Sequence, residues 1–137
     1  MLDKRKFYIN GKWVSPSKPN DLDVIDPCTE ETVAVISLGS KDDTNAAVSA
    51  AKTAFESWKE SSKEERVALL EKLLTIYKKR YSEMVDAISL EMGAPTDWSK
   101  DVQTASGQSH IEDFILRLKE FEFDKKFSPE SNNRICY

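Results

Sequence analysis

The chain has 137 residues, of which 39% are hydrophobic and 32% charged, and its formal net charge is −4. The length suits one domain of ordinary size, and the composition is typical of a globular protein with a well-solvated surface. The acidic balance argues against nucleic acid and anionic membranes as partners, because both favour a basic face. No apolar run approaches the roughly 20 residues that a membrane-spanning helix needs.

Cysteine content and the first residues bear on the compartment. Cys28 and Cys136 are too few and too far apart to indicate a disulfide framework or a zinc site. The charged residues 3–6 have the charge of a secretory leader, but no long apolar segment follows them. Together with thiols expected to be unpaired and reduced, this predicts a cytoplasmic protein.

Two strand pairs are predicted before residue 40, at 7–9 with 12–14 and at 22–25 with 32–38. Asn10-Gly11 predicts a tight hairpin in the first pair, because both residues tolerate the positive φ of a type I′ turn. The second pair contains β-forming residues and is divided by turn residues at 26–31.

The helical part begins with an amphipathic helix that ends near residue 60. Ser40 with Asp43 forms a capping pattern at its start, in which the serine oxygen accepts hydrogen bonds from first-turn amides. Ser62 with Glu65 forms a second capping box and predicts the start of a longer helix.

The longer helix is expected to bend near residues 80–82 and to end at Gly93 in the left-handed conformation. Pro95 suits the first turn of a third helix, which runs to about residue 120. Gly107 in the interior of that helix indicates close packing against a neighbour, because an unneeded glycine there costs about 1 kcal/mol relative to alanine.

Residues 121–137 differ from the helical part. Phe121 and Phe123 alternate with acidic residues, a polar segment follows, and Ile135-Cys136-Tyr137 is typical of a second strand. We expect a hairpin arm that breaks off inside this strand, and therefore a truncated chain. The element order predicts an α/β fold without a complete parallel sheet, since it contains no strand–helix–strand unit.

In this order the segments resemble the N-terminal part of the NAD(P)-dependent aldehyde dehydrogenase superfamily. The stretch from Phe7 to Val14 is similar to the family's I-N-G-x-W hairpin, and Val24 to Glu31 is similar to its N-P-x-T-x-E turn. The resemblance continues through Ser40-x-x-Asp43, Ala47-Val48-x-Ala50-Ala51-x-x-Ala54-Phe55-x-x-Trp58, Glu65-Arg66-x-x-Leu69-Leu70 and Glu91-Met92-Gly93-Ala94-Pro95. Each piece is weak alone, but the ordered set is specific and covers essentially the whole chain.

Two positions depart from the family pattern. Asp26 stands where the family usually has asparagine, and either side chain can cap the turn. Glu30 replaces a common glycine, which is tolerable if the local φ stays negative.

The resemblance implies an aldehyde dehydrogenase-like N-terminal region with two hairpin-like strand pairs, three helices and the start of a bridging arm. Residues 1–120 would be the N-terminal part of the cofactor-binding domain, and 121–137 the start of the bridging or oligomerisation hairpin. This region is incomplete without the rest of the enzyme. The implied partners are a small aldehyde and further copies of the enzyme, as a dimer or tetramer formed through the arm.

The implied reaction is oxidation of an aldehyde to a carboxylic acid with NAD or NADP, through a thiohemiacetal and thioester on a cysteine. The family's cysteine, general base, oxyanion asparagine and cofactor-binding residues all lie beyond this chain. We therefore assign no catalytic and no cofactor-binding residue here, and expect the chain alone to bind no cofactor and to be inactive.

Several residues have a structural and a functional interpretation. Cys28 and Cys136 do not match the family's nucleophile position and are interpreted as incidental thiols. His110 lacks an identifiable partner that would make it a general base, and a helix-surface position explains it better. The glycines at 11, 39, 93 and 107 form no phosphate-binding motif.

Aromatic side chains on the helices are interpreted as core, or as the face that meets the missing domain; they are Phe55, Trp58, Tyr77 and Tyr81. Trp13 in the hairpin is expected to pack as well. Because substrate-tunnel residues of the family come partly from the third helix, Trp98 and Gln103 are candidates for that role.

A monovalent cation site is the single metal candidate. Some family members bind such an ion through carbonyl groups before the N-P turn and an acidic side chain on the third helix. Val24, Ile25 and Gln103 occupy the matching positions, although the amide of Gln103 lacks the anchoring charge. A plain hydrogen bond from Gln103 to the strand is the alternative.

The competing hypothesis for the whole chain is a free-standing, non-catalytic interaction or capping module related to aldehyde dehydrogenase. Such a module would pair with full-length subunits through its arm.

Overall fold

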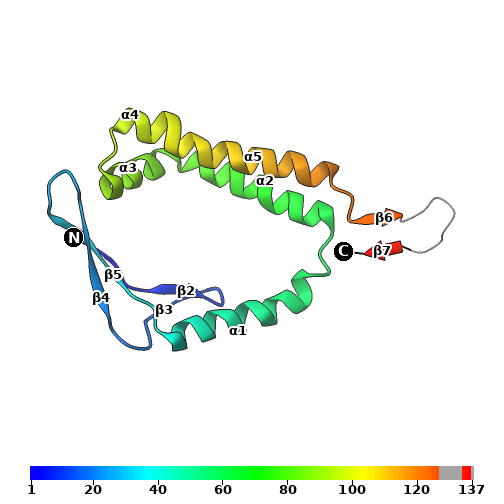
Figure 1. Cartoon of the computed structure of the whole chain (residues 1–137), viewed down its shortest axis with the longest axis horizontal. Coiled ribbons are helices and arrows are strands. Elements are labelled where there is room, and N and C mark those ends of the chain that lie inside the picture. Colours follow the sequence, from blue (N-terminus) through cyan, green and yellow to red (C-terminus); the bar gives the residue numbers. More distant parts are fainter. Residues whose placement is uncertain (127–133, 137) are drawn as a thin grey trace.

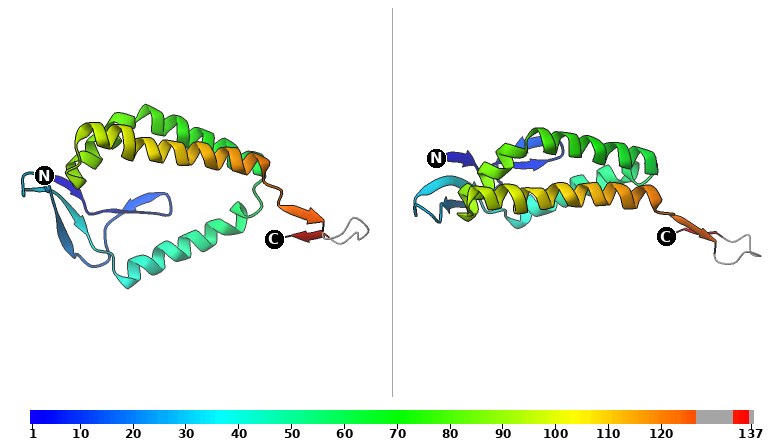
Figure 2. Two further views of the ribbon diagram at one scale, coloured as in Figure 1. Left: turned by 45° about the horizontal axis from the view of Figure 1, so that its top comes forward. Right: turned by 90° about the horizontal axis from the view of Figure 1, so that it is seen from above.

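The computed structural model describes residues 1–126 and 134–136. Its helices and small sheets form an open frame. Figure 1 shows α2, α3 and α5 along one side of the frame, α1 along the opposite side, β4 and β5 at one end, and β2 and β3 beside α1. The two further views in Figure 2 show that this frame is thin. This arrangement leaves much of each element's surface without a neighbour from the same chain.

The main sheet has three strands, β1 (Leu2–Lys4), β5 (Thr32–Ser37) and β4 (Asp21–Ile25), in that order. β4 pairs with β5 antiparallel, and β1 pairs with β5 parallel. The prediction of two separate strand pairs is therefore wrong in one respect, because β1 joins the second pair. β1 is exposed throughout and is mostly charged, so it lacks the alternating hydrophobic pattern that predicts strands.

A separate hairpin joins β2 (Phe7–Ile9) to β3 (Lys12–Val14). Asn10 and Gly11 have φ of 51° and 73°, as the type I′ prediction requires.

Helix α1 spans Lys41–Trp58 and begins with the predicted capping box at Ser40 and Asp43. The Asp43 carboxylate accepts hydrogen bonds from the Ser40 amide (2.9 Å) and from the Ser17 amide (2.8 Å). The cap therefore also ties the β3–β4 connection to the start of the helix.

The second predicted helix is divided into α2 (Lys63–Lys79) and α3 (Tyr81–Met92). Its capping box at Ser62 and Glu65 is confirmed. The predicted bend is a break at Arg80, where φ is −102° and ψ is 19°. Gly93 ends α3 with φ of 65°, which confirms the left-handed stop.

The third predicted helix consists of α4 (Thr96–Trp98), a π-helix η1 (Ser99–Thr104) and α5 (Ala105–Glu120). Two tyrosine hydroxyls donate to carbonyl groups of η1: Tyr77 to Thr104 (2.9 Å) and Tyr81 to Lys100 (2.6 Å). A Cβ atom on Gly107 would collide with the Tyr77 hydroxyl, so the predicted close packing at this glycine is confirmed.

Past α5, β6 (Asp124–Lys126) pairs antiparallel with β7 (Arg134–Cys136), which gives the chain a hairpin beyond its helices. Part of the predicted arm, residues 127–133 and Tyr137, lies outside the described residues.

The buried hydrophobic core is small among the residues that the structure describes. It consists of Ala34, Val35, Val85 and Ile115. Trp13 is 67% exposed, so the expectation that it packs is wrong; its ring contacts Tyr8 at a centroid distance of 5.3 Å. Phe55 and Trp58 are also exposed, whereas Tyr77 and Tyr81 are half-buried.

Candidate functional site

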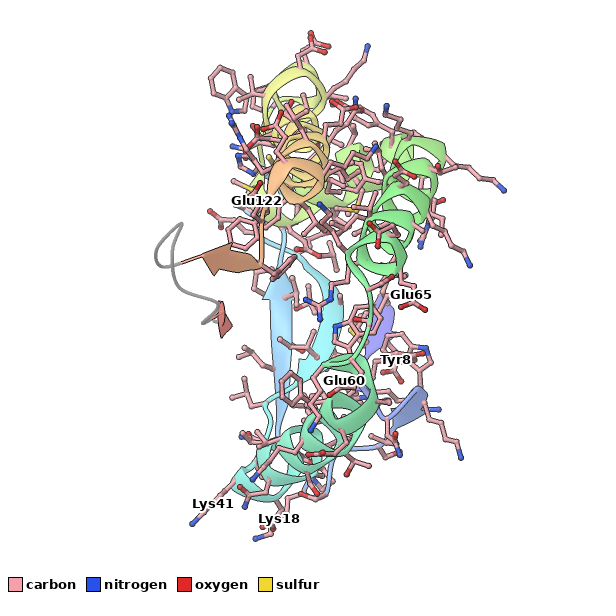
Figure 3. All side chains as sticks on the ribbon, turned by 90° about the vertical axis from the view of Figure 1, so that its right-hand side faces the viewer. Tyr8, Lys18, Lys41, Glu60, Glu65 and Glu122 are labelled. Carbon is pink, nitrogen blue, oxygen red and sulfur yellow. The ribbon has the colours of Figure 1, made fainter. Side chains whose placement is uncertain are left out.

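An apolar groove lies between α2 and α5 near the end of α1. It has a volume of about 420 Å³, and six of its eight lining side chains are apolar. The lining residues come from all three helices and the segment after α5: Trp58, Arg66, Leu69, Leu70, Phe114, Arg117, Leu118 and Phe121. Figure 3 views this end of the frame, where Glu60 follows α1, Glu65 lies in the first turn of α2 and Glu122 follows α5.

Polar contacts at the edge of the groove join the helices. Lys119 pairs with Glu71 at 2.7 Å, which links α5 to α2. Arg66 donates to the Ser61 hydroxyl (2.9 Å), and its guanidinium lies 5.6 Å from the centre of the Phe123 ring. These contacts hold the two walls together and leave the apolar side chains between them uncovered.

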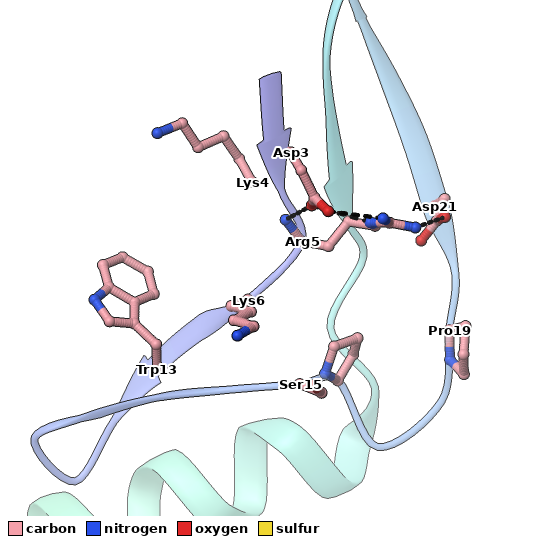
Figure 4. Close-up of a pocket in the computed structure, with 9 residues that line it drawn as sticks. Asp3, Lys4, Arg5, Lys6, Trp13, Ser15, Pro19 and Asp21 are labelled. Carbon is pink, nitrogen blue, oxygen red and sulfur yellow. Dashed lines mark hydrogen bonds and ion pairs between the residues drawn. The ribbon is translucent and has the colours of Figure 1, made fainter. Parts of the chain in front are cut away.

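A second cavity of about 790 Å³ lies beside the β2–β3 hairpin (Figure 4). Arg5 spans its rim and binds Asp3 at 2.7 Å and Asp21 at 3.2 Å. Hydrogen bonds from Arg5 hold the pKa of Asp3 at about 2, and the charges of Arg5 and Lys6 act in the same direction. The two aspartates raise the pKa of Arg5 above its ordinary range.

The turn between β4 and β5 packs against the end of α3. The Asp26 carboxylate accepts from the Cys28 amide at 2.8 Å, which confirms that this side chain caps the turn. Glu30 has φ of 60°, so the condition of a negative φ is not met and the glutamate takes the left-handed conformation. The reason is the tight closure of the turn, in which the Glu30 amide donates to the Asp26 carbonyl (2.8 Å) and the Asp26 amide to that of Glu31 (2.9 Å).

The two candidate groups for catalysis that the structure describes stand apart. The Cys28 thiol is exposed and lies 3.7 Å from the Gly93 carbonyl. His110 is exposed on α5. The side chain of Cys136 lies outside the description. No cluster of three or more histidine, cysteine, aspartate or glutamate side chains suited to a metal ion occurs in the described part of the chain.

The three residues of the cation hypothesis lie on two elements. Val24 is half-buried and Ile25 is 46% exposed at an irregularity of β4, while Gln103 is half-buried in η1. A cation held by these three residues and the alternative, a plain hydrogen bond from Gln103 to the strand, both stay predictions.

The residues present do not fit a dinucleotide cofactor. Its phosphates require closely spaced glycines between a strand and a helix. Here Gly11 forms a hairpin, Gly93 ends a helix, Gly107 packs against Tyr77, and Gly39 stands alone before α1. No step of dinucleotide chemistry is therefore assigned to this chain.

Sequence reasoning missed the apolar groove and the cavity at the hairpin. The groove is formed by helices far apart in the sequence, and its one local signal was the apolar face of each helix. The cavity lies within residues 3–21, and no local pattern indicated how this segment folds back on itself. None of the described helices is long and apolar enough to cross a membrane.

Mixed strands and capped helices with exposed apolar faces define the class of this chain as an α/β protein. A model of the aldehyde dehydrogenase family matches residues 13–137, and the chain belongs to that family. It corresponds to an N-terminal segment.

Individual relatives agree with this assignment. The chain is 36% identical over 126 residues to a 3-succinoylsemialdehyde-pyridine dehydrogenase from a Pseudomonas species, covering 91% of this chain and 26% of that protein. It is 55% identical to an aldehyde dehydrogenase of Bartonella henselae, with a TM-score of 0.93 and coverage of 96% and 28%.

A variant of aldehyde dehydrogenase C from Pseudomonas syringae, solved with NAD+ and octanal, is 34% identical with a TM-score of 0.88. That match covers 90% of this chain and 26% of that structure. The chain thus spans about a quarter of the length of the relatives that it matches.

Proposed function

We propose that this chain is the scaffold-forming N-terminal portion of an NAD(P)-dependent aldehyde dehydrogenase and that the chemistry resides in the remainder of the enzyme. The apolar groove carries this proposal. Phe114 and Leu69 in its walls are 70% and 52% exposed, and Trp58 is 46% exposed. Contiguous apolar surface of this kind indicates a surface that another part of the protein covers.

The proposed reaction of the whole enzyme is oxidation of a small aldehyde to a carboxylic acid. Such a reaction needs an activated thiolate and a bound dinucleotide. Cys28 lacks a neighbouring base among the described contacts, and the glycines do not cradle phosphates. Both observations favour a structural role for Cys28 and the glycines over a catalytic or cofactor-binding one.

The proposal extends to the oligomeric assembly of the enzyme and to its cellular compartment. The hairpin of β6 and β7 extends from the frame, which supports a role for residues 121–137 in joining subunits of a cytoplasmic homo-oligomer. Occupation of Val24, Ile25 and Gln103 by a monovalent cation stays a prediction, as does a contribution of Trp98 to the substrate tunnel.

An activity assay of the purified chain tests whether the catalytic residues lie outside these 137 residues. We expect no aldehyde-dependent formation of NADH or NADPH, measured by the absorbance of reduced nicotinamide, with octanal and with a short aldehyde. A full-length aldehyde dehydrogenase assayed in parallel is the control. Turnover that persists after further purification would place the nucleophile in these residues and contradict the proposal.

A further inference from the structure

The cavity beside the β2–β3 hairpin combines an exposed aromatic ring with two lysines that pair with none of the described residues. Its walls include Trp13 from β3, Ser15 and Pro19 from the following loop, and Lys4 and Lys6 near β1. In Figure 4, Trp13 and Pro19 stand on opposite sides, with Lys6 between them. A volume of about 790 Å³ lies within the range of small-molecule sites, roughly 300–1,000 Å³.

The upper wall of the cavity is fixed by ion pairs. Arg5 binds Asp3 through two nitrogen atoms, at 2.7 and 3.0 Å, and reaches Asp21 at 3.2 Å. Its guanidinium is therefore satisfied by the protein and is not available to a ligand. The same ion pairs hold the segment before β2 against the start of β4, so the wall is preorganised.

Two ammonium groups are left for a ligand. Lys4 and Lys6 form no ion pair or hydrogen bond with any described residue. Three cationic and two anionic side chains line the cavity, so its lining carries a single net positive charge. A monoanion complements this lining, whereas a dianion would exceed it.

The aromatic wall specifies the rest of the ligand. Trp13 is 67% exposed, and among the described residues its ring has one aromatic neighbour, Tyr8, which is tilted by 60°. A planar ring can therefore stack on the indole, and apolar proline atoms face it across the cavity. The Lys6 ammonium can then receive a negative group carried by that ring.

We propose that this cavity binds a singly charged aromatic carboxylate, with the ring on Trp13 and the carboxylate at Lys6. The site goes beyond the scaffold role and does not depend on the missing catalytic residues.

The test uses the complete 137-residue chain labelled with nitrogen-15. Its three tryptophans, Trp13, Trp58 and Trp98, give three indole N–H resonances, and loss of one resonance in Trp13→Phe assigns Trp13. Titration with benzoate should shift the Trp13 resonance saturably and leave the other two in place. Benzamide has the same ring without the charge and should bind at least about tenfold more weakly, as expected from loss of a hydrogen bond to a charged group.

Matched lysine variants locate the anion contact. Lys6→Gln should weaken benzoate binding about tenfold or more. Lys12→Gln, next to Trp13 but outside the cavity lining, should leave the affinity unchanged.

Four outcomes would overturn the proposal: equal shifts of all three indoles, equal binding of benzamide, equal loss in the two lysine variants, or tighter binding of the dianion phenyl phosphate.

Discussion

The backbone of Glu30 adopts the left-handed conformation, which residues other than glycine seldom take. Its φ of 60° closes the turn from Asp26 to Glu31. The left-handed conformation costs an L-residue roughly 1–2 kcal/mol. The turn keeps this residue in place because two backbone hydrogen bonds close it around Glu30.

Glu30→Gly is therefore expected to raise the free energy of unfolding by about 0.5–1 kcal/mol, since relief of strain exceeds the added freedom of the unfolded chain. Glu31→Gly, at a residue without positive φ, is the matched control and should lower it. Urea unfolding of both variants measures the difference. Destabilisation of similar size in both would show that Glu30 carries no strain.

Asp43 joins the start of α1 to the loop before β4. The Ser40 amide first, and then the Ser17 amide, hold the pKa of Asp43 at about 2, below its ordinary 3.8. As the pH falls below 3.8, the unfolded chain takes up this proton before the folded chain does. The stabilisation is therefore fully present above pH 3.8 and is lost as the pH falls toward 2.

Asp43→Asn should melt at a lower temperature than the unaltered chain, with the largest gap above pH 3.8 and a shrinking gap toward pH 2. Asp42→Asn changes charge in the same turn without touching the Ser40 and Ser17 contacts, and serves as the control. Circular dichroism melts over this pH range are the measurement. A gap for Asp43→Asn that is independent of pH would contradict the role of its carboxylate.

The elements differ in how far the sequence predicts them. Capping boxes, the Asn10-Gly11 turn and the Gly93 stop depend on neighbours within a few residues, and all were predicted. The π-helix was not, because Tyr77 and Tyr81 from α2 and α3 bind its carbonyl groups. Gly107 predicted close packing at that point of the helix but not that Tyr77 is the residue that packs there.

Sites were harder to predict than elements for the same reason. The groove combines residues separated by tens of positions, such as Trp58 with Phe114. The hairpin cavity lies within residues 3–21, but it depends on how β1, the hairpin and the start of β4 fold back on one another. Local patterns identify an apolar face on each helix but not which faces meet. The positive φ of Glu30 had one sequence signal, the glycine that the family commonly has at this position.

The molecule as a whole exposes apolar surface on elements that enclose little core. The exposed groove residue Phe114 has no buried contact to lose, whereas Leu118 on the same helix is half-buried. The isolated chain is therefore expected to self-associate through its exposed apolar surface and to bind an apolar dye.

Phe114→Glu should reduce self-association in sedimentation experiments while leaving the melting temperature nearly unchanged. Leu118→Glu is the matched comparison and should destabilise the fold, because it places a charge where an apolar side chain is partly buried. A monodisperse unaltered chain with a sharp cooperative melt and no dye binding would instead favour the free-standing module.

The most direct test of a scaffold role is a chimera. The segment of the Bartonella henselae aldehyde dehydrogenase that matches this chain at 55% identity would be replaced by the chain itself. The chimera should reduce NAD+ with an aldehyde at a kcat/KM within about tenfold of the parent, because it keeps all of the parent's chemistry beyond the exchanged segment. The same chimera carrying Cys28→Ser should be equally active. A folded chimera without activity, or loss of activity on Cys28→Ser, would contradict the account.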